Sequence, residues 1–308
     1  MTKYIVRRLL QMIPVIIGST FLIFAMVFAL PGNPLAGKCG ERPCPPAFVE
    51  KFRADHNLDD PLPIRYVKYL GDLAHGNFGT TFQGLNVLDE LQKRYLITVK
   101  LAVIALLFEA IIGVLAGVLA GIRKGKFIDN LVLVSTLVVI SIPTFVIGSL
   151  AQTIFGVKLG WFPVTTPSKP GWYDLLLPGL VLGSLSLAYA ARLTRTNLAE
   201  NLRADYVRTA VAKGLSRPRV IGVHTLRNSL IPVVTFLGAD FGGLLGGAII
   251  TERIFNIRGV GGYIFQSINS RDGTAVVGAV TMLVIVYLFM NLLVDILYGV
   301  LDPRISHD

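Results

Sequence analysis

The chain has 308 residues, a mean hydropathy of +0.64 and only 16% charged residues, whereas soluble domains carry about a quarter. This composition excludes an ordinary soluble enzyme and indicates a polytopic membrane protein. The formal net charge of +10 does not indicate nucleic-acid binding, because the basic residues concentrate beside apolar segments, where membrane topology and anionic lipids account for them.

The chain begins with a short basic segment followed by an apolar one. Lys3, Arg7 and Arg8 precede residues 9–30, which are apolar over about the ~20 residues that a spanning helix needs. A signal peptide is the alternative, but the apolar stretch exceeds the usual ~7–15 residues and lacks an evident small-x-small cleavage site. We therefore predict an uncleaved first helix whose basic end lies in the cytoplasm.

Residues 31–95 form a polar insert that is long enough to contain helices of its own. Its charges balance, so it lacks the basic excess of a cytoplasmic loop, and we expect it outside the cell. It contains the chain's only two cysteines, Cys39 and Cys44. Outside the cytoplasm these would be natural disulfide partners, and two free thiols are the alternative. A pair with this spacing and no further ligands is a poor zinc site, so we expect no metal.

Two further spans are predicted at residues 97–121 and 131–155. Glu109 lies near the middle of the first. Such an acid can be a proton or substrate site, but we favour a polar packing contact between helices. Pro143 lies near the centre of the other span and predicts a kink.

A fourth span at residues 175–191 leads into a polar, basic stretch at residues 192–228. Asn197 is a candidate N-cap there, with Glu200 at the N3 position of a capping box. Gly214 provides the left-handed residue that ends many helices. We predict an amphipathic helix ending at this glycine, then a second short helix capped by Ser216.

The predicted helix at residues 198–213 has one apolar stripe, formed by Leu198, Leu202, Tyr206 and Ala210 at four-residue spacing. A surface helix must bury such a stripe. In a chain that is otherwise mostly membrane-embedded, the groove of a soluble partner protein is a reasonable place for it.

The fifth and sixth spans are predicted at residues 229–250 and 274–298. Glycines recur every four residues in the fifth span and favour close packing against another helix. Asp240 is a second intramembrane acid, for which we favour helix–helix hydrogen bonding. Six spans from a cytoplasmic N terminus place both termini and the basic stretch inside, as the distribution of Lys and Arg requires.

The sequence thus predicts an all-α membrane protein with three parts. Residues 1–30 contain the N-terminal lead and first span, residues 31–95 the external insert, and residues 96–308 a five-helix core with the cytoplasmic loop at residues 192–228.

Three separated stretches of the chain share a family resemblance. They are Leu58-Asp59-Asp60-Pro61-Leu62 with Gly76-Asn77-Phe78-Gly79, then Asp205-Tyr206-Val207-Arg208-Thr209-Ala210 with Ala212-Lys213-Gly214-Leu215, and lastly Asn291-Leu292-Leu293-Val294-Asp295 with Leu301-Asp302-Pro303-Arg304-Ile305. Together they resemble the permease subunits of dipeptide- and oligopeptide-type ABC importers, which depend on a binding protein. The resemblance implies a type I importer fold in the cell membrane.

The resemblance also implies a function and partners. The chain would form the translocation pathway of an ATP-driven importer of short peptides, together with a second homologous permease, two ATPase subunits or a fused pair, and an external substrate-binding protein. No cofactor is implied. A helix at residues 198–214 would transmit the work of the ATPases. The residues implied in this coupling are Leu202, Asp205, Tyr206, Arg208, Thr209, Ala210, Lys213 and Gly214.

The sequence is also compatible with other substrates and with other kinds of membrane protein. Relatives of this kind carry dipeptides, oligopeptides, glutathione or nickel, and no pattern here selects among them. The chain lacks a phosphate-binding loop, an H-E-x-x-H pair and a nucleophile elbow, so we expect no enzymatic activity and no catalytic residue. An ion-coupled secondary transporter using Glu109 and Asp240 is the main alternative. Six spans without an evident inverted repeat disfavour it. A membrane scaffold is a third, weaker option.

Overall fold

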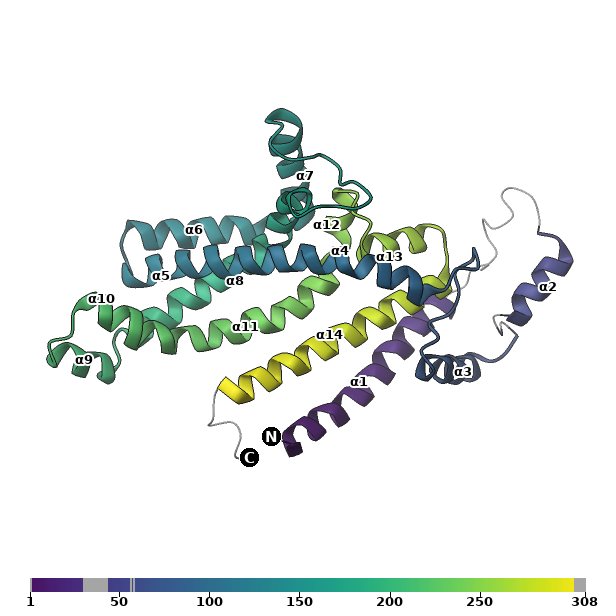
Figure 1. The fold of residues 1–308 in the computed structure, drawn as a ribbon, viewed down its shortest axis with the longest axis horizontal. Coiled ribbons are helices and arrows are strands. Elements are labelled where there is room, and N and C mark those ends of the chain that lie inside the picture. Colours follow the sequence, from purple (N-terminus) through teal and green to yellow (C-terminus); the bar gives the residue numbers. More distant parts are fainter. Residues whose placement is uncertain (1, 30–43, 56, 58, 302–308) are drawn as a thin grey trace.

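The computed structural model describes residues 2–29, 44–55, 57 and 59–301. Regular structure within them is helical, apart from an isolated bridge between Thr80 and Asn86. The prediction of an all-α membrane protein is therefore confirmed. Figure 1 shows an elongated bundle, with α9 and α10 at one end and α2 and α3 at the other.

Five helical runs of the described chain are long and apolar enough to cross a membrane. Two of them are single helices, α1 (Thr2–Phe28) and α14 (Gly273–Leu301). In the second run, α4 (Val87–Phe108) continues through a π-helical turn (Glu109–Gly113) into α5 (Val114–Ile122), and in the third a 3-10 turn (Tyr173–Leu175) leads into α8 (Leu176–Asn201). In the fourth run, α10 (Arg217–Arg219) continues through a π-helical turn (Val220–Thr225) into α11 (Leu226–Gly247). The shorter helices are α2 (Pro46–Asp55), α3 (Leu62–Ala74), α9 (Asp205–Ala212), α12 (Ile249–Ile254) and α13 (Val260–Asn269).

The third predicted span is sharply bent. Helix α6 (Phe127–Ser141) and the run formed by α7 (Thr144–Ala151) and a π-helical turn (Gln152–Lys158) meet at 100° on either side of Pro143. The predicted kink at Pro143 is thus confirmed, but it breaks the span. The pair provides a sixth crossing only if it counts as one span. The side chain of Gln152 attaches this arm to α12 by donating to the Ile254 carbonyl at 3.1 Å.

The main apolar core joins α4, α8 and α11. Close helix contacts depend on small residues, as predicted. A Cβ atom on Gly117 would lie 2.5 Å from the carbonyl oxygen of Ala191, and one on Gly238 would lie 2.8 Å from Val294. The glycines of α5 therefore let α8 approach, and the glycines of α11 pack against α14 of the same chain.

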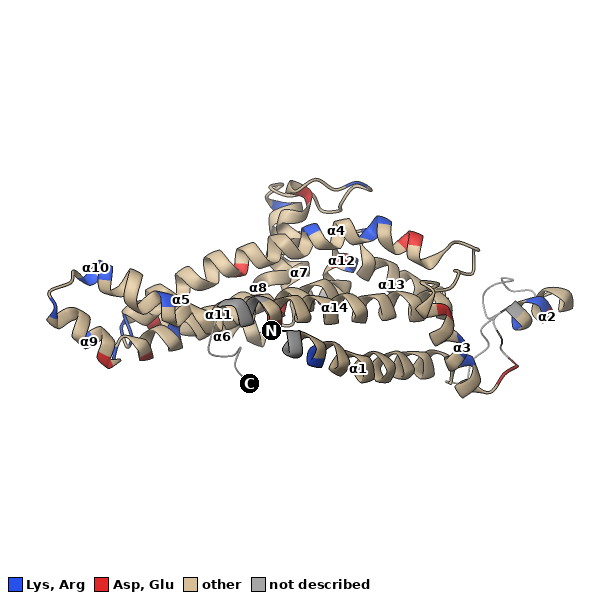
Figure 2. Ribbon diagram, turned by 60° about the horizontal axis from the view of Figure 1, so that its bottom comes forward, with Lys and Arg blue, Asp and Glu red and all other residues tan. Residues whose placement is uncertain are grey.

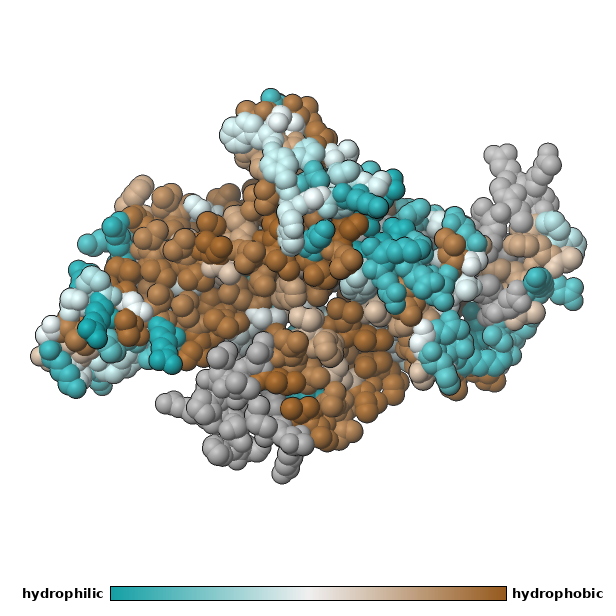
Figure 3. Space-filling view, in the orientation of Figure 1, coloured by the Kyte–Doolittle hydropathy of each residue, from teal (hydrophilic) through white to brown (hydrophobic). Residues whose placement is uncertain are grey.

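Helices α1 and α14 run side by side in opposite directions (Figure 1). Arg8 and Asp295 join them through an ion pair at 3.3 Å. Charged residues gather at the two ends of the molecule in Figure 2, and Figure 3 shows an apolar surface between these ends. This distribution matches a bundle whose middle lies in hydrocarbon.

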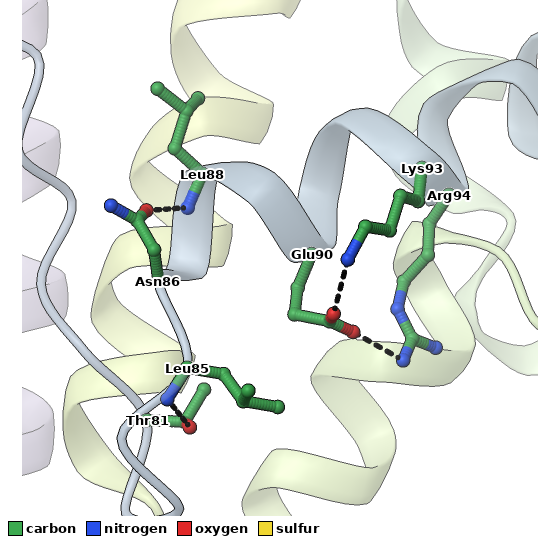
Figure 4. Close-up of polar contacts among 7 residues, drawn as sticks. All are labelled: Thr81, Leu85, Asn86, Leu88, Glu90, Lys93 and Arg94. Atoms are coloured by element: carbon green, nitrogen blue, oxygen red, sulfur yellow. Dashed lines mark hydrogen bonds and ion pairs between the residues drawn. The ribbon is translucent and has the colours of Figure 1, made fainter.

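Helix α4 begins at Val87, earlier than the predicted residue 97, because polar side chains stabilise its first turns (Figure 4). The Asn86 side chain caps the helix by accepting the Leu88 N–H at 2.8 Å. One turn further, Glu90 pairs with Lys93 at 3.2 Å and with Arg94 at 3.0 Å. Such pairs at three- and four-residue spacing stabilise a helix.

Two predicted boundaries around the basic stretch are wrong. Helix α8 continues to Asn201, and Asn197 is an interior residue whose amide donates to the Leu193 carbonyl at 2.8 Å. The helix continues because Leu198 is fully buried against α5, where Gly121 leaves room for it. The fifth helical run likewise begins at Arg217 and not at residue 229.

Candidate functional site

The candidate site is the exposed helix α9 together with the turn that follows it, at the end of the molecule opposite α2 and α3 (Figure 1). Helix α9 ends at Ala212, and Gly214 then adopts φ +77°. This left-handed residue lets the amide of Leu215 donate back to the Ala210 carbonyl at 3.3 Å. The glycine that the sequence predicts as a stop therefore has the expected conformation.

The inner face of α9 packs within the chain. Val207 and Ala210 are 5% and 7% exposed and contact Val220 and Leu215. The predicted apolar stripe of residues 198, 202, 206 and 210 is therefore not a single surface, because residues 202–204 interrupt the helix. Leu198 belongs to the bundle and Ala210 to this small cluster, so neither is available to a partner.

The outer face of α9 presents most of the predicted coupling residues. Leu202 is half-buried beside it, whereas the side chains on this face are exposed: Asp205, Tyr206, Arg208, Thr209, Val211 and Lys213. Asp205 and Arg208 form an exposed ion pair at 3.4 Å, which contributes little to stability. An aromatic ring, an apolar Val211 and two cations on a short rigid helix make a surface suited to protein contact.

A chain of hydrogen bonds connects α9 to two long helices. The Tyr206 hydroxyl donates to Oδ1 of Asn201 at 3.2 Å, and the Asn201 amide donates to Oγ of Ser229 at 3.0 Å. Asn201 is the last residue of α8, and Ser229 lies in the first turns of α11. Tyr206 is thus linked through Asn201 to both helices. The sequence prediction missed Asn201 and Ser229, because no local spacing brings residues 28 positions apart together.

An ion pair fixes α6 to α8 near this surface. Arg195 binds Asp129 with two parallel hydrogen bonds, from Nε at 2.9 Å and from a terminal nitrogen at 2.8 Å. The amide of Gly125 donates to the same carboxylate at 2.8 Å. Asp129 is only 1% exposed, so its charge depends on these donors.

A second buried carboxylate organises the other end of the core. Glu252 in α12 is fully buried and accepts a hydrogen bond from the Thr98 hydroxyl at 2.7 Å and one from the Gly262 amide at 2.7 Å. Thr98 in turn accepts the Val260 amide at 2.9 Å. The carboxylate, which itself lies in α12, therefore attaches α4 to the first turn of α13.

The Glu252 network predicts a pH dependence of stability. Burial raises the pKa of Glu252 to about 7, because desolvation outweighs the hydrogen bonds that lower it. From about pH 4.5 to 7 the folded state retains a proton that the unfolded state has lost, so folded stability decreases as the pH rises through this window. We expect the wild-type protein to unfold at a lower temperature at pH 8 than at pH 5.

The control for this prediction separates Glu252 from the other carboxylates. Glu252→Gln should flatten the pH dependence, whereas Glu50→Gln, at an exposed position of α2, should leave it unchanged. Thermal unfolding in detergent at pH 5 and pH 8 measures the difference. A Glu252→Gln protein with the wild-type pH dependence would contradict this assignment.

A cavity of about 470 Å³ opens at the α3 end of the bundle. It lies between α1, α3 and the start of α14, and its lining includes Phe24, Phe28, Arg65, Lys68, Asp72 and Asn77. The Arg65 guanidinium lies over the Phe28 ring at 4.7 Å. The cavity has a partly charged lining, unlike the apolar surface of the bundle. It is therefore a polar recess, and it lies in the region predicted to be external.

The two acids inside the bundle lie near one another. Glu109 on the α4–α5 run is fully buried, and Asp240 on α11 interacts with it electrostatically. The predicted polar contact between these helices is thus present, and the two carboxyl groups are close enough for a hydrogen bond between them.

The structure brings no metal-binding cluster together among the residues it describes. Of the predicted disulfide, Cys39 lies outside the described residues, so the Cys39–Cys44 bond stays a prediction.

Comparison with known proteins gives consistent matches over the whole chain. Residues 113–307 match the family described as binding-protein-dependent transport system inner membrane component, and residues 1–102 match its N-terminal family. A di/tripeptide transport system permease protein of Pseudomonas aeruginosa is 38% identical, with 100% of this chain and 99% of that protein covered. A dipeptide transport system permease protein of Alkalihalophilus pseudofirmus is 36% identical, and a glutathione transport system permease protein of Escherichia coli is 34% identical. Both are covered completely, as is this chain.

Proposed function

The chain belongs to the family of binding-protein-dependent transport system inner membrane components, and we propose that it forms the translocation pathway of an ATP-driven importer of short peptides. The observation that carries the proposal is full-length similarity to permeases whose names specify dipeptides or di/tripeptides, at 36–38% identity. Glutathione is the second candidate, because a permease named for it is 34% identical. Glutathione is itself a short peptide derivative, so both candidates belong to one chemical class.

The exposed face of α9 is our proposed contact with the ATPase subunits. It is rigid, because its inner face is packed against Val220, and it is attached to α8 and α11 through Asn201. In this proposal, closure of the ATPases moves α9, and the two long helices transmit that motion to the pathway. The residues that touch the ATPases are Tyr206, Arg208, Thr209, Val211 and Lys213.

In the complete importer the chain has a defined orientation and further partners. The α9 end faces the cytoplasm, and the α2 and α3 end receives an external substrate-binding protein. A second homologous permease completes the pathway, because the α11 face carrying Ala239 and Gly243 is uncovered in this chain. Two ATPase subunits or a fused pair provide the energy.

Reconstitution tests the proposed function. The permease pair, the ATPases and the binding protein are incorporated into proteoliposomes, and uptake of labelled alanyl-alanine and of labelled glutathione is measured. We expect uptake of alanyl-alanine that requires both ATP and the binding protein. Uptake driven by a proton gradient without ATPases would reject the proposal in favour of a secondary transporter. Uptake of glutathione alone would reassign the substrate.

A further inference from the structure

The cavity at the α3 end of the bundle has the size and the lining of a small-molecule site. Its volume of about 470 Å³ falls within the ~300–1,000 Å³ of ligand pockets, which are mostly apolar with a few polar groups. Aromatic side chains from α1, from α3 and from the segment between α3 and α4 supply much of its surface: Phe24, Phe28, Tyr69 and Phe78. It lies far from α9 and takes no part in the coupling proposed above (Figure 1).

One face of α3 forms the charged side of the cavity. Arg65, Lys68, Tyr69 and Asp72 all line it, and their spacing of three, four and seven residues places them on one face of the helix. Because an α-helix rises about 1.5 Å per residue, the backbone positions of Arg65 and Asp72 are about 10.5 Å apart. The cavity therefore has a cation at one end of this face and a carboxylate two helical turns away.

The guanidinium of Arg65 is held in place, but no anionic group binds it. It lies over the Phe28 ring at 4.7 Å and over the Phe24 ring at 5.8 Å. Such stacking uses the flat face of the guanidinium and leaves its in-plane N–H donors free. Its buried Nε accordingly has no hydrogen-bond partner. Asp60 acts on this charge electrostatically, but Lys68 binds the Asp60 carboxylate at 2.6 Å.

The charges of this face differ in their availability to a ligand. Lys68 already donates to Asn57 at 3.0 Å and to Asp60 at 2.6 Å. The side chain of Asp72 is exposed, and no ion pair in the described part of the chain includes Asp72 or Arg65. The cavity thus presents one unpaired positive group and one unpaired negative group, both carried by the same rigid helix.

We propose that this cavity binds a short peptide of about three residues, with its terminal carboxylate on Arg65 and its terminal ammonium group on Asp72. This inference rests on the proposed function, which makes short peptides the cargo, and adds a recognition site on the face proposed to be external. A carboxylate accepts two in-plane N–H donors of a guanidinium, and an ammonium group donates to a carboxylate. An extended chain spans at most ~3.3–3.6 Å per residue, so three residues cover about 10 Å.

The lining and the separation of the charges give the site its selectivity. Asn77 and Thr80 add side-chain hydrogen-bonding groups for the peptide backbone, and the aromatic rings offer apolar surface to its side chains. A dipeptide is too short to reach both charges. A peptide that is blocked at either end leaves one of the two charges without a partner, which a site built on paired groups rejects.

Calorimetric titration of the purified complex of permeases and ATPases tests the site. The binding protein is omitted, because it would itself take up peptide. The probes are trialanine, trialanine amide, N-acetyl-trialanine and dialanine. We expect trialanine to bind about tenfold more tightly than each of the other three, which corresponds to the loss of one charge-assisted hydrogen bond.

Variants without the charge assign each end of the peptide to its residue. Arg65→Gln should weaken trialanine binding about tenfold and leave trialanine amide unaffected, so that these two probes bind equally. Asp72→Asn should instead equalise trialanine and N-acetyl-trialanine. Arg65→Lys keeps the charge and should retain a preference for the free carboxylate. Arg258→Gln and Asp89→Asn make the same chemical changes at exposed positions outside the cavity and should preserve the wild-type order.

The outcomes separate the site from the proposed function. One common affinity for all four probes, or no binding of trialanine, would overturn the site. A co-purifying phospholipid that native mass spectrometry finds in wild type but not in Arg65→Gln, without trialanine binding, would assign the cavity to a lipid headgroup instead. Trialanine binding with the expected ratios, in a complex that takes up no peptide, would keep the site and reject the proposed function. Peptide uptake by a complex whose binding ignores both termini would do the reverse.

Discussion

Gly214→Val should reduce peptide uptake about tenfold while the complex still assembles and hydrolyses ATP. Gly214 has φ +77°, and a Cβ atom there would meet nothing within 4 Å. The substitution therefore causes no clash, and its whole effect is on the backbone. A β-branched residue in the left-handed region costs ~1–2 kcal/mol, and ~1.4 kcal/mol corresponds to a factor of ten. The turn that ends α9 would open, and α9 would lose its fixed position against Val220.

Two control variants test whether this loss comes from backbone strain at Gly214. Gly214→Asn should retain most of the uptake, because asparagine tolerates the left-handed conformation. Gly76→Val places the same strain at φ +77°, also in open space, at the opposite end of the molecule. Gly76→Val should leave unchanged the number of peptides transported per ATP hydrolysed. Measurement of uptake and ATP hydrolysis in the same proteoliposomes gives that ratio. Wild-type coupling in Gly214→Val would refute the role of this turn.

Asp129→Asn should lower the free energy of unfolding more than the same substitution in an exposed ion pair does. The carboxylate is almost fully buried and accepts three hydrogen bonds, two from Arg195 and one from the Gly125 amide. Its removal leaves the Arg195 guanidinium partly buried without a counter-charge, at a cost of about 3–5 kcal/mol. The measurement is the unfolding midpoint of the purified protein in detergent.

The comparison is with an ion pair that is open to solvent. Asp295→Asn makes the same change in the pair with Arg8, where the two side chains are 42% and 30% exposed. It should cost no more than ~1 kcal/mol. Replacing Arg195 by leucine in the Asp129→Asn protein should recover part of the stability, because the uncompensated charge is then absent. Equal losses for the two single variants would show that burial does not govern these pairs.

The sequence predicts the helical class, the existence of the spans and the left-handed glycine, because each depends on local composition or on one residue's backbone. It does not predict where α8 ends. The candidate cap at Asn197 is a correct local pattern, but burial of Leu198 against α5 outweighs it, and that contact depends on Gly121. Tertiary packing overrides weak local signals of this kind.

Only part of the candidate site could be predicted, because the rest also depends on tertiary packing. The exposed residues of α9 follow from the family-like motif, whereas the inward direction of Ala210 depends on Val220, which lies on the next helical run. The Arg195–Asp129 pair joins residues 66 positions apart. No spacing rule within one helix indicates such a pair. The 100° bend at Pro143 exceeds an ordinary proline kink and became evident only from the three-dimensional arrangement.

Helix α8 has a mechanical consequence for the whole molecule. Its 26 residues form one uninterrupted helix about 39 Å long. In its first half the backbone of α4 comes so close that a Cβ atom on Gly183 would lie 2.8 Å from the Ala105 oxygen, and in its second half a Cβ atom on Gly117 of α5 would lie 2.5 Å from the Ala191 oxygen. Helix α8 is therefore held against the α4–α5 run in both halves, and the two form one stiff pair. A displacement imposed on Asn201 moves this pair as one body and so reaches the opposite end of the bundle.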